Sequence, residues 1–227
     1  MVASLIEQKF AVKLGLTPQK PLERAYRRDP EAIEKWKRKT YPSIASAAKA
    51  QGGEVYFRNE SGFGADTVHG KTWGKKGETP VIARPDQRQS IGAASAVDAK
   101  RAFWYSTYQG GLNALLFVKL LKQMMRHRTK PVHLVVDGPP ARKTKLVKKY
   151  VATTEGRPTL HFLPGYAPKL NPDELVWSHV KRTGVSRTPL RKGEKLSEKI
   201  DAQLAAIKKM PGLARAFLNP SVAYITD

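Results

Sequence analysis

The chain has 227 residues, contains no cysteine, and carries 41 Lys and Arg against 19 Asp and Glu, a formal net charge of +22. The absence of thiols excludes disulfides, cysteine zinc sites and thiol nucleophiles. A domain this basic repels itself unless it binds a polyanion, so nucleic acid is the partner that we expect first. Simple solubility or an anionic membrane surface are the alternatives, although the sequence contains no basic amphipathic anchor.

Apolar residues make up 41% of the chain, which is typical of a globular protein, and the length suits one core with a small appendage. The first sixteen residues, MVASLIEQKFAVKLGL, are too polar and charged for a signal peptide. No apolar run is long enough to cross a bilayer. We therefore expect a soluble, cytoplasmic protein that does not contact a membrane.

The first predicted element is a helix that follows a basic, proline-interrupted linker at residues 1–28. The Asp-Pro-Glu sequence at 29–31 is a helix start, with Asp as N-cap and Pro at the first helical position. We expect this helix to run to about Ala50, to bend at Pro42, and to end at the two glycines of 52–53.

The remaining elements follow from hydrophobic periodicity and from turn residues. Residues 112–127 have apolar side chains at helical spacing, and residues 132–136 are an apolar, β-branched run typical of a buried strand. The full prediction comprises strands at 54–61, 90–97, 102–110, 132–136 and 159–163, a hairpin at 69–81, and helices at 112–127, 141–154, 171–184 and 196–210.

The order of these elements predicts an α/β fold. Early strands joined by short connections favour antiparallel pairing, and the later strand–helix–strand stretch favours parallel strands added to the same sheet. A mixed sheet flanked by helices is the expected result. Active sites in such sheets collect at strand ends.

Asp137 stands at the end of the buried strand VHLVV and is followed directly by Gly138 and two prolines. An Asp at this place can accept turn hydrogen bonds beside the glycine. It can also present a carboxylate for chemistry at the tip of a strand. The sequence around Asp137 alone leaves both interpretations open.

A second acid, Glu174, lies 37 positions later, near the start of a predicted helix. Asn171 would be its N-cap and Pro172 its first residue, so Glu174 fits a capping box, and Asp173 fits the helix dipole. Considered together, Asp137 and Glu174 can instead converge on a divalent metal. Mg²⁺ prefers oxygen ligands, and two such ions roughly 4 Å apart support phosphodiester cleavage.

Two stretches resemble the catalytic core of insertion-sequence transposases of the mariner-like DDE superfamily: VVDGPPAR at 135–142 and LPGYAPKLNPDELVWSHVK at 163–181. In that family a strand-end Asp precedes the pattern Pro-Tyr-x-Pro-x-Leu-Asn-Pro-x-Glu-x-x-Trp. Residues 166–177 match it, with Gly165 standing before Tyr166. Upstream, ESGF and GKTWGKKGETPV resemble the first catalytic strand of the family and its following hairpin.

This resemblance covers roughly residues 15–215 and implies an RNase H-like fold. It also implies two Mg²⁺ or Mn²⁺ ions, cleavage and strand transfer of double-stranded DNA by a homodimer, and no small-molecule cofactor. Three regions are expected: 1–45 as a remnant of the DNA-binding region, 46–186 as the catalytic domain, and 187–227 as a helical extension. Family members usually begin with helix-turn-helix domains, so we interpret the chain as truncated, a fragment or an isolated catalytic domain.

The first catalytic acid of the family falls at Asn59, which offers a neutral oxygen and no charge. Glu60 or Asp66 could replace it only through a bulge or a bend, because adjacent strand residues face opposite sides of a sheet. We therefore expect Asn59, Asp137 and Glu174 at the metal site, with impaired activity. The alternatives are a catalytically inactive DNA-binding protein or, less favoured, a nuclease that acts on RNA or hybrids.

Basic residues crowd the predicted helix after Asp137. A solvated helix face would explain them, but their closeness to the acids favours contacts to nucleic-acid phosphates, which carry affinity without sequence information. The histidines show no metal-binding spacing, so packing or surface roles are expected for His127 and His133, and core packing for Trp177. The predicted nucleic-acid-binding residues are Arg142, Lys143, Lys145, Lys148 and Lys149.

Overall fold

A computed structural model of the chain describes residues 29–65, 75–77, 89–98, 102–138, 143–185 and 190–218. The predicted hairpin at 69–81 lies outside the described residues, apart from the turn at 75–77. Within the described ranges, no helix combines the length and apolar character needed to cross a membrane.

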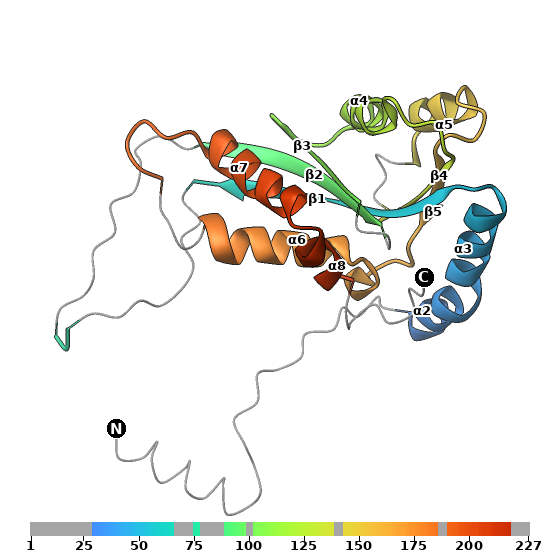
Figure 1. Ribbon diagram of the computed structural model, residues 1–227, viewed down its shortest axis with the longest axis horizontal. Coiled ribbons are helices and arrows are strands. Elements are labelled where there is room, and N and C mark those ends of the chain that lie inside the picture. The colour runs from blue at the N-terminus through green and yellow to red at the C-terminus, as the bar shows by residue number, and fades with distance from the viewer. Residues whose placement is uncertain are drawn as a thin grey trace, which may run out of the picture.

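A five-stranded mixed sheet forms the centre of the structure, with the strand order β3-β2-β1-β4-β5 (Figure 1). β1 pairs antiparallel with β2, and β2 antiparallel with β3, whereas β1–β4 and β4–β5 are parallel. The predicted mixed sheet is therefore confirmed. The strands are β1 Glu54–Gly64, β2 Ser90–Asp98, β3 Phe103–Tyr108, β4 Val132–Val136 and β5 Thr159–Phe162.

Helices cover both faces of the sheet, and the alternation of side chains along each strand supplies the two cores. On one face, Tyr56 and Val136 pack with α4 (Ala114–Met125) and α5 (Lys145–Ala152). The residues next to them, Phe57 and Val135, face the other core, which we call the α6 side. That core contains α2 (Pro30–Lys35), α3 (Tyr41–Ala50), α6 (Asp173–Val180), α7 (Leu196–Lys209) and α8 (Pro211–Ala216).

The first predicted helix forms, and it changes its winding just before Pro42. Asp29 caps α2 by accepting a hydrogen bond from the N–H of Ala32 at 3.0 Å. Residues Trp36–Thr40 then form a π-helical turn, in which the N–H of Tyr41 bonds to the carbonyl of Trp36. Pro42 has no N–H, and its ring crowds the carbonyl four residues back, which accounts for the irregular turn there.

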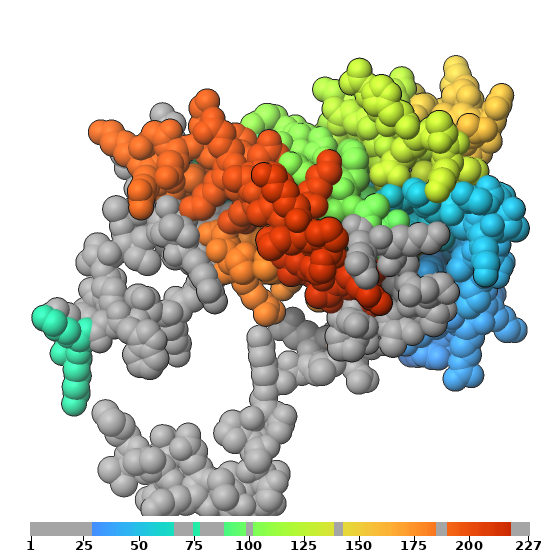
Figure 2. All heavy atoms as spheres, viewed as in Figure 1, coloured from blue at the N-terminus to red at the C-terminus, as the bar shows by residue number. Residues whose placement is uncertain are grey.

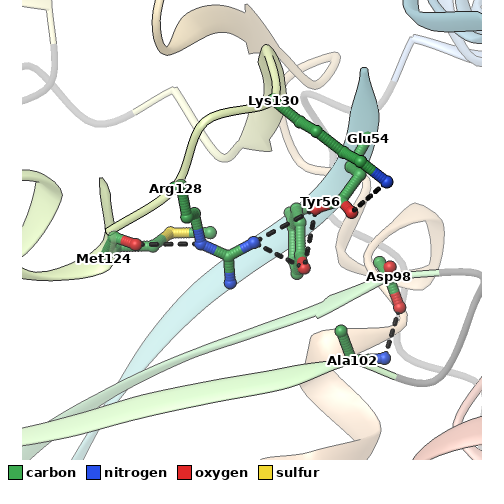
Figure 3. Close-up of polar contacts among 7 residues, drawn as sticks. All are labelled: Glu54, Tyr56, Asp98, Ala102, Met124, Arg128 and Lys130. Carbon is green, nitrogen blue, oxygen red and sulfur yellow. Dashed lines mark hydrogen bonds and ion pairs between the residues drawn. The ribbon is translucent and has the colours of Figure 1, made fainter. Parts of the chain in front are cut away.

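A cluster of polar contacts fixes the starts of β1 and β4 beside each other (Figure 3). Arg128, in the loop between α4 and β4, donates to Glu54 at 3.2 Å and to the hydroxyl of Tyr56 at 2.8 Å. Its Nε donates to the carbonyl of Met124 at 2.9 Å, which anchors the loop to α4. Burial raises the pKa of Tyr56 to about 12, so this phenol stays protonated. From this end of the sheet, β1 and β4 run parallel and in register as far as the pair of Arg58 and Val136.

Element boundaries differ from the predicted ones by a few residues, and side-chain caps account for two of the starts. Asn113 accepts from the N–H of Leu116 and starts α4, while Thr144 accepts from Val147 and starts α5. α6 is shorter than predicted, because a π-helical turn, Lys181–Val185, replaces its last residues.

Candidate active site

Asn59 lies in the middle of β1, level with Asp137, which directly follows the end of the adjacent parallel strand β4. The last pair in the β1–β4 register is Arg58 with Val136, so the next residues along the two strands are Asn59 and Asp137. They follow the same alternation as Phe57 and Val135, which face the α6 side. The structure therefore places the predicted first and second site positions next to each other on one face of the sheet.

Glu174 lies in the first turn of α6, which packs against β1 on this face (Figure 1). The pKa of the Asp137 carboxyl is raised to about 6, first by its burial and then by the negative charge of Glu174. A hydrogen bond from the side chain of Asn171 opposes this shift. Two half-buried carboxylates that repel each other are a typical arrangement for binding a cation.

Asn171 connects the start of α6 to both strands. Its side-chain amide donates to the carbonyl of Arg58 at 3.2 Å and also bonds Asp137, while its Oδ1 accepts from the N–H of Asp173 at 3.1 Å. Pro172 stands at the N-cap position of α6, so the predicted N-cap assignment is wrong by one residue, although Asn171 still accepts from the first helical N–H, that of Asp173. The N–H of Asn171 donates to the carbonyl of Pro168, so the side chain of Glu174 does not accept from it and no capping box forms. The Glu174 carboxylate therefore has no capping role.

Asp173 has a larger role than the helix-dipole interpretation gave it, because its side chain is fully buried. Its Oδ2 accepts from the backbone N–H of Asn59 at 2.8 Å, and the Ser95 hydroxyl lies 2.9 and 2.8 Å from its two oxygens. Burial holds the pKa of Asp173 well above its ordinary value, although these hydrogen bonds and the charge of Arg58 oppose the shift. In the sequence, this buried role is indicated only by the two adjacent acids at a predicted helix start, Asp173 and Glu174. The structure shows that Asp173 is the one that faces inward.

Asn59 contributes an amide where the predicted site needs a carboxylate. Its side chain is buried, and its Oδ1 accepts from the N–H of Glu60 at 2.9 Å. Among the described residues, no three His, Cys, Asp or Glu side chains form a group that could hold a metal ion. The donor set of two carboxylates and one neutral oxygen suits one divalent cation, but it lacks the charge that a pair of cations needs.

Glu60 does not replace the missing acid, because it lies on the opposite face of the sheet. Its carboxylate pairs with the buried guanidinium of Arg58, which lies 4.6 Å from the ring centre of Phe117 in α4. β1 pairs with β2 without a bulge from Tyr56 to Gly64, so the alternation is unbroken at Glu60. Asp66, the other candidate, lies outside the described residues.

Lys143 is the predicted basic residue that the structure places nearest to the end of β4. Its Nζ lies 5.1 Å from the ring centre of Phe162, and a Cβ built on Gly138 would come within 3.2 Å of it. The ammonium group is thus held beside the residue that follows Asp137. Arg142 lies outside the described residues.

The other predicted basic residues form one surface with the neighbouring helix. α4 and α5 pack side by side and cover one end of the molecule (Figure 2). α5 contains no acidic residue, and its exposed cations Lys145, Lys148 and Lys149 lie on the outer surface. Exposed cations of α4, Lys119 and Lys122, extend this surface.

The remaining side chains singled out in the sequence have packing roles, apart from the exposed His127. Trp177 is buried, with its ring 5.8 Å from that of Phe63, as predicted. His133 is also buried and stacks on His161, with their nitrogens 3.1 Å apart. His133 lies near the start of β4, at the other end of that strand from Asp137.

Comparison with protein families agrees with this architecture. Residues 54–197, more than half of the chain, match the DDE superfamily endonuclease family, and the chain belongs to that family. These residues contain the sheet, Asn59, Asp137 and Glu174, and they form a DDE superfamily endonuclease domain with an RNase H-like fold. Residues 12–40 match a winged helix-turn-helix family, of which the structure describes residues 29–40.

Solved structures of a mariner transposase share the fold at low sequence identity. The Mos1 transposase paired-end complex with the left transposon end is 14% identical, with a TM-score of 0.64, over 96% of this chain and 69% of that one. A Mos1 mariner paired-end complex with Mn gives the same values except for a coverage of 70% of that chain. The Mos1 catalytic domain is 15% identical, with a TM-score of 0.53, over 90% and 97% of the two chains. No curated protein gives a significant match.

Proposed function

We propose that the chain binds double-stranded DNA and has the architecture of a metal-dependent strand-cleaving and strand-transfer domain, impaired by Asn59. The observation that carries the proposal is that Asp137, next to the level of Asn59 on β1, is close enough to Glu174 at the start of α6 for the two charges to repel each other. The similar Mos1 structures include complexes with a transposon end, with Mn and with Mg, which supports a DNA substrate and a divalent cation.

The protein groups have distinct tasks in this proposal. Asp137 and Glu174 would hold the cation, and Asn171 would orient Asp137 through its amide. A bound Mg²⁺ or Mn²⁺ would supply the Lewis acidity that activates water and stabilises the leaving oxygen of the phosphodiester. Lys143, whose Nζ lies near Gly138, would contact a phosphate of the bound DNA. The freed 3′-hydroxyl would then attack target DNA, as the family resemblance implies.

Asn59 reduces this activity through charge. A two-ion site concentrates four positive charges, and a carboxylate at position 59 would offset one of them. Asn59 supplies none, and its Oδ1 is already engaged with the N–H of Glu60. We therefore expect at most one tightly held cation in the native chain and weak or absent cleavage.

Duplex DNA would contact the basic surface of α5, on the face of the sheet opposite the acids, through Lys143, Lys145, Lys148 and Lys149, with Arg142 as the fifth predicted contact. Phosphate contacts of this kind give affinity that falls steeply with salt. The family resemblance implies a homodimer that works on two DNA ends. A second candidate function, DNA binding without cleavage, is favoured by the neutral Asn59 and requires only this surface.

Nicking of a supercoiled plasmid in Mn²⁺ by the Asn59→Asp variant, with and without Asp137→Asn, tests the assignment of the site. Cleavage that disappears with Asp137→Asn would support it, whereas unchanged cleavage would show that another group holds the cation. Binding of duplex DNA without cleavage by any variant would favour the DNA-binding protein. Preference for an RNA–DNA hybrid over duplex DNA would move the assignment to a hybrid-cleaving nuclease.

A further inference from the structure

Two side chains, those of Asn171 and Asp173, attach the start of α6 to the sheet. The neighbouring carboxylate of Glu174 takes no part in this attachment. Asn171 donates to the carbonyl of Arg58, and Asp173 accepts from the N–H of Asn59 and from the hydroxyl of Ser95. These contacts engage β1 and β2 at the level where β4 ends. Glu174 follows Asp173 directly, so the position of Glu174 depends on this attachment.

The environment of Asp173 differs from that of a metal ligand. Its side chain has no exposed surface, and its oxygens are occupied by the N–H of Asn59 and the hydroxyl of Ser95. An asparagine has the same shape, and its oxygen can accept from the N–H of Asn59 while its NH₂ donates to the hydroxyl oxygen of Ser95, so it can keep both attachments without charge.

We propose that Asp173 is a positioning residue that anchors the start of α6 to β1 and β2 and thereby holds Glu174 opposite Asp137. The proposal rests on the proposed function of the Asp137 and Glu174 pair. It assigns Asp173 no contact with substrate or metal. It also gives the sequence Asn-Pro-Asp-Glu a division of roles, in which Asn171 and Asp173 attach the helix and Glu174 faces the site.

Two readouts test the anchor in the native chain. Hydrogen exchange of the amides of 171–180 reports the attachment of α6, and titration with Mn²⁺ reports the Asp137 and Glu174 pair. Asp173→Ala should speed exchange in this segment and weaken Mn²⁺ binding by roughly tenfold, the usual effect of losing a residue that supports a metal site. Asp173→Asn should keep both properties within about a factor of two, because it keeps the hydrogen bonds.

Two further variants separate positioning from general destabilisation. Val118→Ala, in the core on the opposite face of the sheet, should lower stability without changing exchange at 171–180 or Mn²⁺ affinity. Ser95→Ala, which removes one of the two partners of Asp173, should have an effect between those of Asp173→Asn and Asp173→Ala.

Equal losses of Mn²⁺ affinity in Asp173→Asn and Asp173→Ala would overturn the proposal and show that the charge of Asp173 acts on the cation. Unchanged exchange in Asp173→Ala would overturn it as well. A failure of the proposed cation site would look different, because Mn²⁺ affinity would then not change in Asp137→Asn. The hydrogen-exchange experiment would still decide whether Asp173 anchors α6.

Discussion

The backbone N–H of Asn59 donates a hydrogen bond to the Asp173 carboxyl at 2.8 Å, across 114 positions of the chain. This contact joins the middle of β1, at the level where β4 ends, to the start of α6, the helix that carries Glu174. Because the Asn59 side chain is itself buried, a carboxylate at this position would enter an enclosed environment that already contains the carboxyl groups of Asp173 and Glu174. The consequences can be measured.

Asn59→Asp should destabilise the metal-free protein by about 1 to 3 kcal/mol, because it buries another carboxyl group close to Asp137 and Asp173. Mn²⁺ should restore most of this loss in the variant and much less in the native chain, since binding to the folded state stabilises it. Urea unfolding with EDTA and with Mn²⁺ measures both. Equal effects of Mn²⁺ on the two proteins would contradict the placement of residue 59 at a cation site.

The raised pKa of Asp137 predicts a pH dependence of stability. The folded-state pKa, about 6, exceeds the ordinary 3.8, so folding favours the protonated form. This contribution is fully present below about pH 4 and is lost as the pH rises through 6, by on the order of 2 kcal/mol. Between pH 4 and pH 7.5 without metal, the native chain should lose more unfolding free energy than Asp137→Asn. Parallel pH profiles would refute the buried, repelled state of this carboxyl.

Asn171→Ala should remove the bond that opposes the shift, so the pKa of Asp137 should rise further, as measured by carboxyl NMR. The variant also leaves the Arg58 carbonyl and the Asp173 N–H without this partner, at an expected cost of about 2 kcal/mol. Asn113→Ala is the matched control, because it removes a helix cap from α4 and should leave the pKa of Asp137 unchanged. A similar pKa in both variants would show that Asn171 does not orient Asp137.

Lys148→Ala with Lys149→Ala should weaken binding to duplex DNA of any sequence, because phosphate contacts carry no sequence information. Each lost contact should lower the slope of log affinity against log salt by about 0.9. The control pair, Lys208→Ala with Lys209→Ala, removes two exposed cations at the end of α7. Fluorescence anisotropy at several salt concentrations separates the two pairs, and equal slopes would mean that DNA does not lie along α5.

The parts of the site that could be predicted from the sequence rest on local patterns. A β-branched apolar run identified β4 and hence the position of Asp137 at its tip, and strand alternation assigned Asn59 and Glu60 to opposite faces. The specific pattern around Glu174 located the start of α6 within two residues.

The contacts of Asp173 and Asn171 could not be predicted in this way. Their partners lie on β1 and β2, so these roles depend on how α6 packs against the sheet rather than on spacing along the chain. An Asp in the first turn of a helix has a sufficient local explanation in the helix dipole. Only its complete burial distinguishes Asp173 from that ordinary case.

Side-by-side plasmid nicking in Mn²⁺ by the native chain and by Asn59→Asp tests the central claim. This claim is that the fold contains a DDE site whose cleavage activity is impaired by the neutral side chain at position 59. We expect the variant to nick and the native chain to nick weakly or not at all, because only the variant supplies the third carboxylate. Equal nicking by the two proteins would contradict the claim and show that Asp137 and Glu174 suffice with the neutral Asn59.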